Sequence, residues 1–379
     1  MATKSKILEM SDIEIIDTAI AMRDAELEHG IKPKTMTIRG IMGSGKTTIP
    51  QRIADRLGLK LVVVSLPTQA LGDTGNPIVK EIDGVKVTTF AWNEYFQFHK
   101  GEAFILCLDE KDKGMLEVRN QFLDVIQKGE INGMRLPKGT IVMCTSNLEG
   151  EGVGDTIYAH ELDREIAVKM KNPSLDSLLE YNSELPTEQK YDPLVLAWAK
   201  EYEGNVFENY LTNPNTVWGI NPSTPKKKGL TMRGLHQASD IFKIKDRLPS
   251  INAFECLITG LIGDVAGLSL LDFQKHEDKL IPIDEIKKNP EKARISEDAI
   301  GKLLTMFNLS QMVEDKESLT TFSKYIGRYE EREFKTLFTK TLTRNKSLHK
   351  HLFSCKPYMA IVKECGKGAV GLGENIDLV

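Results

Sequence analysis

The stretch RGIMGSGKTTIP, from Arg39 to Pro50, decides the fold of this chain. Its three glycines, Gly40, Gly43 and Gly45, stand between an apolar run, TMTIR, and a helical pattern, TTIPQRIADRLG. Glycines let the backbone curl so that successive N–H groups point toward one centre, and the start of the following helix adds its positive dipole end. A strand, a glycine-rich loop and a helix in this order predict a phosphate-binding loop.

The spacing Gly-x-x-x-x-Gly-Lys-Thr over residues 40–47 is that of a complete P-loop. The alternative, a chance glycine-rich turn, is disfavoured because the flanking strand and helix are both present. Lys46 is expected to reach the β- and γ-phosphates of ATP, and the Thr47 hydroxyl is expected to bind Mg²⁺. The nucleotide-binding residues expected from the loop are Gly40, Gly43, Ser44, Gly45, Lys46, Thr47 and Thr48.

The composition is that of a globular protein with room for two or three domains in its 379 residues. The net charge of only −4 gives no overall nucleic-acid signature. Five scattered cysteines without CxxC spacing suit a reducing compartment and are interpreted as buried thiols. There is no apolar run of the roughly 18 residues that a membrane helix needs, and no signal peptide. A cytoplasmic protein without a membrane partner is therefore expected.

Five short apolar runs alternate mostly with helical patterns, such as the one over residues 115–129. This alternation predicts a parallel five-stranded sheet with helices on both faces. An interruption, VKEIDGVKVTTF, predicts a β-hairpin around Asp83-Gly84 between the second and third core strands. The five runs are TMTIRG (35–40), LKLVVVSL (59–66), EAFILCLDE (102–110), GTIVMCTSN (139–147) and REIAVKM (164–170).

The domain organisation follows from where these patterns begin and stop. Ser11 and Glu14 form a capping-box pair that starts an N-terminal helix ending near Glu28. The strand pattern ends near Asn172, and helical patterns follow it. We expect an N-terminal helix over residues 1–30, an α/β nucleotide-binding core over 31–172, an α-helical lid over 173–281 and a C-terminal helical extension over 282–379.

The run FILCLDEKD ends in two carboxylates, Asp109 and Glu110, as in a Walker B strand. Asp109 is expected to hold Mg²⁺, and Glu110 to polarise the attacking water. Adjacent carboxylates could also be a solvated strand end, but an intact P-loop makes that alternative weaker.

Together these motifs resemble those of AAA+ ATPases, in particular the MoxR-like or dynein-related branch, including versions encoded by bacteriophages. Asp73 and Gly75-Asn76-Pro77 match that branch's segment after the second strand, and the inserted hairpin occupies the place of its helix-2 insert. The stretch over residues 136–165 resembles the branch's fourth strand and final core helix. The segment KKKGLTMRGLHQASDIF resembles part of its lid domain.

The resemblance implies roles for four further side chains. Asn147 would be the sensor-1 asparagine, which contacts the attacking water or the γ-phosphate, and Arg233 would be the sensor-2 arginine of the lid. Arg164 would be the arginine finger, donated into the site of a neighbouring subunit, with Arg119 as a substitute. An aromatic residue usually follows the finger in this branch, whereas Glu165 follows it here. The expected catalytic set is Glu110, Asn147, Arg164 and Arg233.

A site completed by a neighbour implies a homo-oligomeric ring, and the branch is typically hexameric. The resemblance implies ATP and Mg²⁺ as cofactors, ATP hydrolysis as the activity, and remodelling of a protein or macromolecular assembly as its use. No motif in the sequence indicates which substrate is remodelled. The inserted hairpin is a candidate contact surface, and a phage-encoded chain would work in the host cytoplasm.

Two alternatives stay open. One is an AAA+ motor or loader that acts on DNA or RNA, because residues 334–363 hold seven Lys or Arg residues and no carboxylate. The same basic stripe could equally dock on an acidic neighbour. The other alternative is a single-chain P-loop kinase, for which the sequence offers no dedicated base at an acceptor site. The histidines have no metal-ligand spacing and are assigned no chemistry.

Overall fold

The computed structural model of the chain describes residues 8–30, 35–148, 158–222 and 227–366. It separates into two compact units, residues 1–172 and 173–379. Among the described residues, no helix combines the length and the apolar character needed to cross a membrane. The predicted fold class, an α/β P-loop core followed by a helical part, is confirmed.

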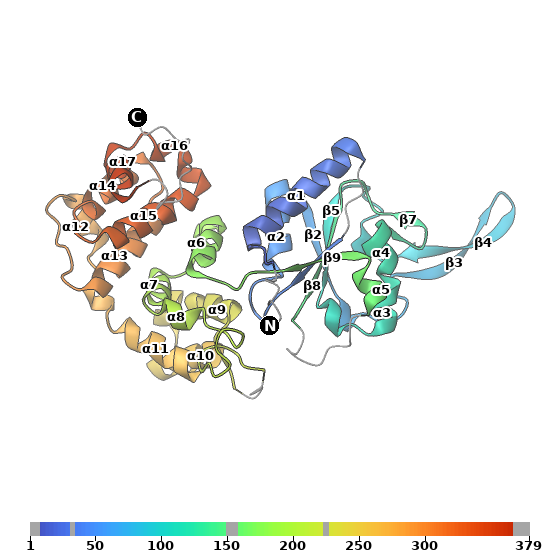
Figure 1. Cartoon of the computed structure of the whole chain (residues 1–379), viewed down its shortest axis with the longest axis horizontal. Coiled ribbons are helices and arrows are strands. Elements are labelled where there is room, and N and C mark those ends of the chain that lie inside the picture. Colours follow the sequence, from blue (N-terminus) through green and yellow to red (C-terminus); the bar gives the residue numbers. More distant parts are fainter. Residues whose placement is uncertain (1–7, 31–34, 149–157, 223–226, 367–379) are drawn as a thin grey trace, which may run out of the picture. The chain divides into compact units, whose positions relative to one another are not determined.

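The centre of the first unit is a five-stranded parallel sheet in the order β2-β5-β8-β1-β9 (Figure 1). All five predicted core strands are present, and β1, which leads into the P-loop, is paired on both sides. The carboxyl ends of β1, β5 and β8 therefore meet at one edge of the sheet. The strands are β1 (Thr35–Arg39), β2 (Lys60–Ser65), β5 (Phe104–Asp109), β8 (Ile141–Ser146) and β9 (Glu165–Lys169).

Helices cover both faces of this sheet, as predicted (Figure 1). On one face, α1 (Asp12–His29) and α2 (Thr48–Leu57) pack on Met36, Ile38 and neighbouring apolar side chains. On the other face, α3 (Leu116–Gln121) and α4 (Leu123–Lys128) pack on the apolar side chains of β2, β5 and β8. The sheet is thus buried on both sides, as parallel sheets are.

The start of α1 is the predicted capping box. The Ser11 side chain accepts the Glu14 N–H at 3.2 Å, and the Glu14 carboxylate accepts the Ser11 N–H at 2.7 Å. These bonds satisfy donors that the first turn of a helix leaves unpaired. They also hold the pKa of Glu14 down at about 2, since they favour its charged form.

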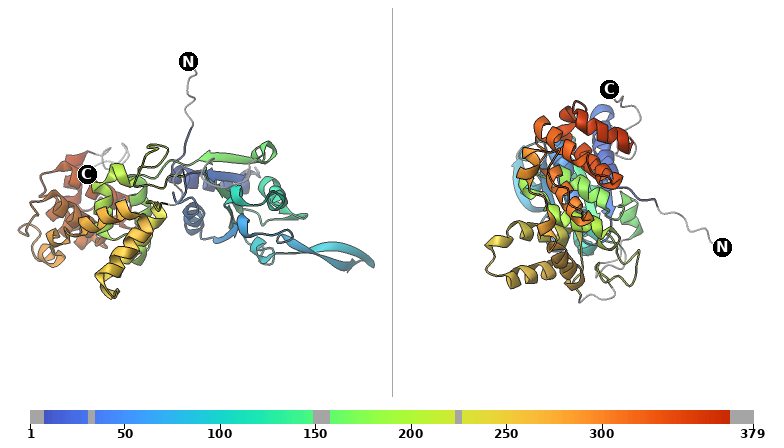
Figure 2. Two further views of the ribbon diagram at one scale, coloured as in Figure 1. Left: turned by 90° about the horizontal axis from the view of Figure 1, so that it is seen from below. Right: turned by 90° about the vertical axis from the view of Figure 1, so that its left-hand side faces the viewer.

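The predicted hairpin consists of β3 (Gly75–Ile82) and β4 (Val85–Trp92) and forms a two-stranded sheet of its own. Asp83 and Gly84 both have positive φ, as the tight turn of a hairpin requires. Figure 2 shows this hairpin extending away from the core sheet of its unit. Its exposed apolar side chains include Val79, Ile82 and Val85.

The structure differs from the predicted continuous helix over residues 115–129. Phe122 separates α3 from α4, and its completely buried ring packs in the core. The helical period itself continues across this break, since Val118, Phe122 and Val125 are all buried in the same core. Beyond α4, β6 (Glu130–Ile131) and β7 (Met134–Arg135) make a short second hairpin, and α5 (Ala159–Leu162) directly precedes β9.

The second unit is helical and surrounds one hydrophobic core, which holds side chains from both the expected lid and the expected extension. The division between these two segments at residue 281 stays a prediction. The helices are α6 (Leu175–Glu184), α7 (Pro193–Glu201), α8 (Glu203–Val206), α9 (Met232–Lys243), α10 (Ile251–Ile262), α11 (Asp264–Gln274), α12 (Ile283–Lys288), α13 (Ala299–Gln311), α14 (Lys316–Ile326), α15 (Arg332–Arg344), α16 (His349–Leu352) and α17 (Lys356–Cys365). Short 3₁₀ turns connect several of them.

The interpretation of all five cysteines as buried thiols is wrong for Cys256, which is exposed on α10. This helix is apolar nearly throughout, but it buries only Phe254, Ile258 and Ile262 on one face. The other cysteines are buried as expected. Burial raises the pKa of Cys107 well above its usual value and that of Cys144 to about 12.

We expect a single fast-reacting thiol in the native chain, because burial keeps the reagent away from the other four thiols. Ellman's reagent should modify one cysteine quickly, and the Cys256→Ser variant should lose this phase. All five cysteines should react in denaturant. A second fast thiol in the Cys256→Ser variant would contradict the burial described above.

Candidate nucleotide-binding site

The P-loop curls around the ammonium group of Lys46. Its Nζ donates to the carbonyl oxygens of Gly40 and Ile41, each at 2.8 Å, and the side chain is largely buried. Gly43 and Gly45 have positive φ, which L-residues with a Cβ rarely adopt. The loop has the backbone conformation for which the sequence uses its glycines.

Two features of this loop fit a bound phosphate. The Ser44 hydroxyl oxygen is buried and has no hydrogen-bond partner within the described part of the chain, so a polar ligand would satisfy it. The loop also ends at α2, whose start places the positive end of the helix dipole beside it. Thr48 closes the turn, because its hydroxyl donates to the Gly45 carbonyl at 2.7 Å.

Hydroxyl and carboxylate oxygens suitable for Mg²⁺ converge beside the loop. The Thr47 hydroxyl donates to the Asp109 carboxylate at 3.3 Å, which brings the P-loop and the end of β5 together. No group of three or more His, Cys, Asp or Glu side chains in the described ranges could hold a metal. One carboxylate and one hydroxyl nevertheless suit Mg²⁺, which takes its remaining ligands from phosphate oxygens and water.

Thr145 is a site residue that the sequence reasoning missed. Its hydroxyl donates to the Asp109 carboxylate and accepts the backbone N–H of Glu110 at 3.1 Å. Thr145 therefore orients the Asp109 carboxylate and fixes the backbone of Glu110. It lies on β8 beside the end of β5, a neighbour relation that requires the pairing of these two strands.

Glu110 has a left-handed backbone conformation, with φ of 53° and ψ of 45°. This conformation is costly for a residue with a Cβ and is typical of functional positions. The carboxylate is partly exposed and forms an ion pair with Lys113, which lies one turn later. It is therefore accessible to a water molecule.

Asn147 directly follows β8 and contacts the P-loop lysine. Its side-chain oxygen accepts from Lys46 Nζ at 3.0 Å, and its backbone N–H donates to the Asp112 carboxylate at 3.2 Å. The structure thus brings Lys46, Asp109, Glu110 and Asn147 to one edge of the sheet. Residues 149–157, which continue the expected sensor segment, lie outside the described residues.

Arg164 lies at the opposite edge. Glu165 pairs with Thr35, the first residue of β1, whereas the P-loop follows the last residue of that strand. The five residues of β1 span about 16 Å from the position of Arg164 to the P-loop, and an arginine side chain is shorter than that. Arg164 is half-buried, and its Nε donates to the Gln127 side chain at 3.0 Å.

The two other candidate arginines lie elsewhere. Arg119 is completely buried beside Glu161 of its own chain, so it is not available to a neighbouring subunit. Arg233 is the exposed second residue of α9 in the second unit, and the Thr231 side chain caps this helix. Its role as sensor 2 stays a prediction.

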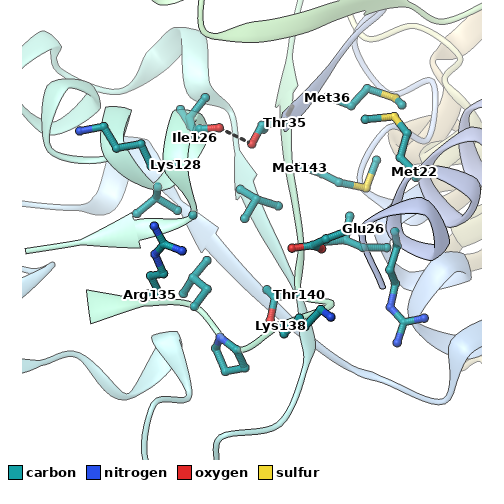
Figure 3. Close-up of a pocket in the computed structure, with 18 of the residues that line it drawn as sticks. Met22, Glu26, Thr35, Met36, Ile126, Lys128, Arg135, Lys138, Thr140 and Met143 are labelled. Atoms are coloured by element: carbon teal, nitrogen blue, oxygen red, sulfur yellow. Dashed lines mark hydrogen bonds between the residues drawn. The ribbon is translucent and has the colours of Figure 1, made fainter. Parts of the chain in front are cut away.

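A cavity of about 380 Å³ lies at the amino-terminal edge of the sheet and is separate from these residues (Figure 3). Met22, Met36 and Met143 line one part of it, and basic side chains line another. The P-loop lies at the carboxyl edge, so this cavity is not part of the nucleotide-binding site.

The basic C-terminal segment is not one continuous stripe. It folds into α15, α16 and α17, and three of its cations have carboxylate partners. Lys335 is buried and pairs with Glu364, while Lys340 and Arg344 both pair with Asp176. These pairs reduce the positive charge available to nucleic acid and do not favour that alternative.

No model of a protein family matches the chain. No curated protein matches it either.

Solved structures to which the chain is similar include the following three. The first is Hsp104 in a closed state with ATPγS and casein, at 16% identity and a TM-score of 0.33, covering 46% of this chain and 35% of that one. The second is an ATPase candidate from Cytophaga hutchinsonii, at 14% identity and a TM-score of 0.32, covering 44% of this chain and 48% of that one. The third is a RuvB mutant from Thermotoga maritima, at 13% identity and a TM-score of 0.34, covering 74% of each chain.

The chain thus spans about a third and about half of the first two proteins. These likenesses are too distant to carry an argument about function. The fold class rests on the sheet and the P-loop, and the MoxR-like branch and the phage origin stay predictions.

Proposed function

We propose that this chain is the subunit of an AAA+ ATPase ring that hydrolyses ATP with Mg²⁺ and remodels a macromolecular assembly in a MoxR-like manner. The observation that carries the proposal is the convergence of Lys46, Thr47, Asp109 and Asn147 at the carboxyl edge of the sheet. A P-loop beside a Walker B carboxylate and a polar strand end is suited to phosphoryl transfer to water.

In this mechanism the P-loop N–H groups and Lys46 bind and orient the phosphates. Thr47 and Asp109 would hold Mg²⁺, which neutralises charge on the β- and γ-phosphate oxygens when bound. Glu110 accepts a proton from the attacking water, and Asn147 helps to position that water. Thr145 holds the Asp109 carboxylate and the backbone of Glu110 in place through its hydroxyl group.

The place of Arg164 supports a ring. An arginine at the far edge of the sheet cannot reach the phosphates of its own subunit. In a ring it would serve the site of a neighbour. Rotational symmetry then gives every subunit one such arginine. We infer a hexamer in agreement with the resemblance, and the exposed hairpin β3–β4 as the surface that contacts the assembly.

The test is the ATP hydrolysis rate per subunit as the protein concentration rises, with particle mass measured on the same samples. The rate should climb as rings form and then level off, since each site is completed only by assembly. The Lys46→Ala variant, which should bind nucleotide weakly, is the inactive control. Full turnover by a particle of monomer mass would refute the composite site and favour the kinase alternative.

A further inference from the structure

A buried cluster of charged side chains lies beside β1 and β9, within the first unit. Lys111 and Arg119 are completely buried, and so are the side chains of Glu161 and Glu165. Charged groups are rarely removed from water without close partners, because their desolvation is costly. None of these four side chains contributes directly to the proposed hydrolysis.

The carboxylate of Glu165 is the centre of this cluster. Its Oε2 lies 2.5 Å from Lys111 Nζ and accepts the Thr37 hydroxyl at 2.7 Å. Its Oε1 lies 3.5 Å from Arg39 Nη2. Glu165 therefore has a distinct partner for each oxygen, which fixes its orientation.

The partners of this carboxylate are sequence neighbours of the site residues. Lys111 directly follows Glu110, the proposed general base, and Glu165 directly follows Arg164, the proposed finger. Arg39 is the last residue of β1 before the P-loop. The Lys111–Glu165 ion pair thus connects the residue directly after the proposed base with the first residue of β9, which directly follows the proposed finger.

The turn before the finger is held by the same cluster. The backbone N–H of Arg164 donates to the Glu161 carbonyl at 3.2 Å. The Glu161 carboxylate lies 3.6 Å from Arg119 Nε and 4.0 Å from Lys111 Nζ. A displacement of Lys111 would therefore act on both sides of Arg164.

We propose that the buried Lys111–Glu165 ion pair transmits the nucleotide state of one subunit's site to the arginine that this subunit lends to the next. The inference rests on the proposed function, and it makes Lys111 and Glu165 positioning residues. Buried, closely packed side chains have few alternative arrangements. Movement of the Glu110 loop therefore shifts Lys111, and Lys111 in turn shifts Glu165 at the start of β9.

The test uses mixed rings in which only one kind of site turns over. Subunits with Arg164→Ala provide the intact catalytic sites. Donor subunits provide Arg164 and carry either Glu110→Gln, which should hold ATP, or Lys46→Ala, which should bind little nucleotide. The phosphate-release rates with the two donors should differ by about fivefold or more, the lower range of allosteric coupling.

Adding Glu165→Gln to both donors should bring the two rates to within about twofold of each other. Because an unpaired buried lysine can impair folding, Lys111→Met together with Glu165→Gln is tested in parallel and should have the same effect. Glu9→Gln is the control. It breaks the more exposed Lys169–Glu9 pair at the other end of β9 and should keep the rate difference.

Equal phosphate-release rates with the Glu110→Gln and Lys46→Ala donors that keep the Lys111–Glu165 pair would overturn the proposal. So would an unchanged rate difference after loss of the ion pair in rings of normal mass. Absence of turnover in every mixture is a separate result, because it would overturn the shared active site on which the proposal rests.

Discussion

Glu110→Gln is expected to keep ATP bound and to lower its hydrolysis by about 10²–10⁴-fold, the usual contribution of a general base. The amide has nearly the same shape as the carboxylate but cannot accept the proton of the attacking water. The lost ion pair with Lys113 is partly exposed, so its removal should change stability little. Phosphate release at saturating ATP measures the loss, and equilibrium dialysis measures the retained ATP.

Glu117→Gln is the matched control for this variant. It makes the same chemical change on an exposed residue of α3. Its hydrolysis rate should equal that of the unmodified protein. A fully active Glu110→Gln enzyme would exclude Glu110 as the general base.

Arg164→Ala is expected to leave ATP binding intact and to lower hydrolysis by about 10³–10⁵-fold, as the loss of an arginine finger does. The sharper result is complementation. In a random 1:1 mixture with Glu110→Gln subunits, half of the sites keep the base, and half of those have a neighbour that keeps the finger. About a quarter of the original rate should therefore return, although each variant alone is inactive.

A finger that acted within its own subunit would give no recovery in this mixture. Arg294→Ala is the control for loss of an arginine, because Arg294 is exposed in the second unit and pairs only with nearby Glu285 in the structure described. That variant should keep full activity. Full turnover by Arg164→Ala alone would require another finger.

The main elements of the fold could be predicted because each has a local signal. Apolar runs mark the five strands, Asp83-Gly84 marks the hairpin turn, and the Ser11–Glu14 spacing marks the start of α1. The break at Phe122 could not be predicted, because Val118, Phe122 and Val125 keep the helical spacing of apolar residues on both sides of it.

The site was predictable in its motifs but not in the residues that support them. Thr145 contacts Asp109 only because β5 and β8 are neighbours, and a single sequence does not reveal strand pairing. The buried charged cluster has one signal in the sequence. In β1, polar Thr35, Thr37 and Arg39 alternate with apolar residues. A polar face on a central strand of a parallel sheet indicates a buried polar network.

The protruding hairpin has a further consequence for the behaviour of the protein at high concentration. A two-stranded ribbon presents two rows of backbone N–H and C=O groups that other chains could extend, which is the first step of edge-to-edge aggregation. Pro77 interrupts one row of donors, and exposed Lys80 and Lys86 place charge along the ribbon. These three residues should therefore oppose self-association of the protein through this hairpin.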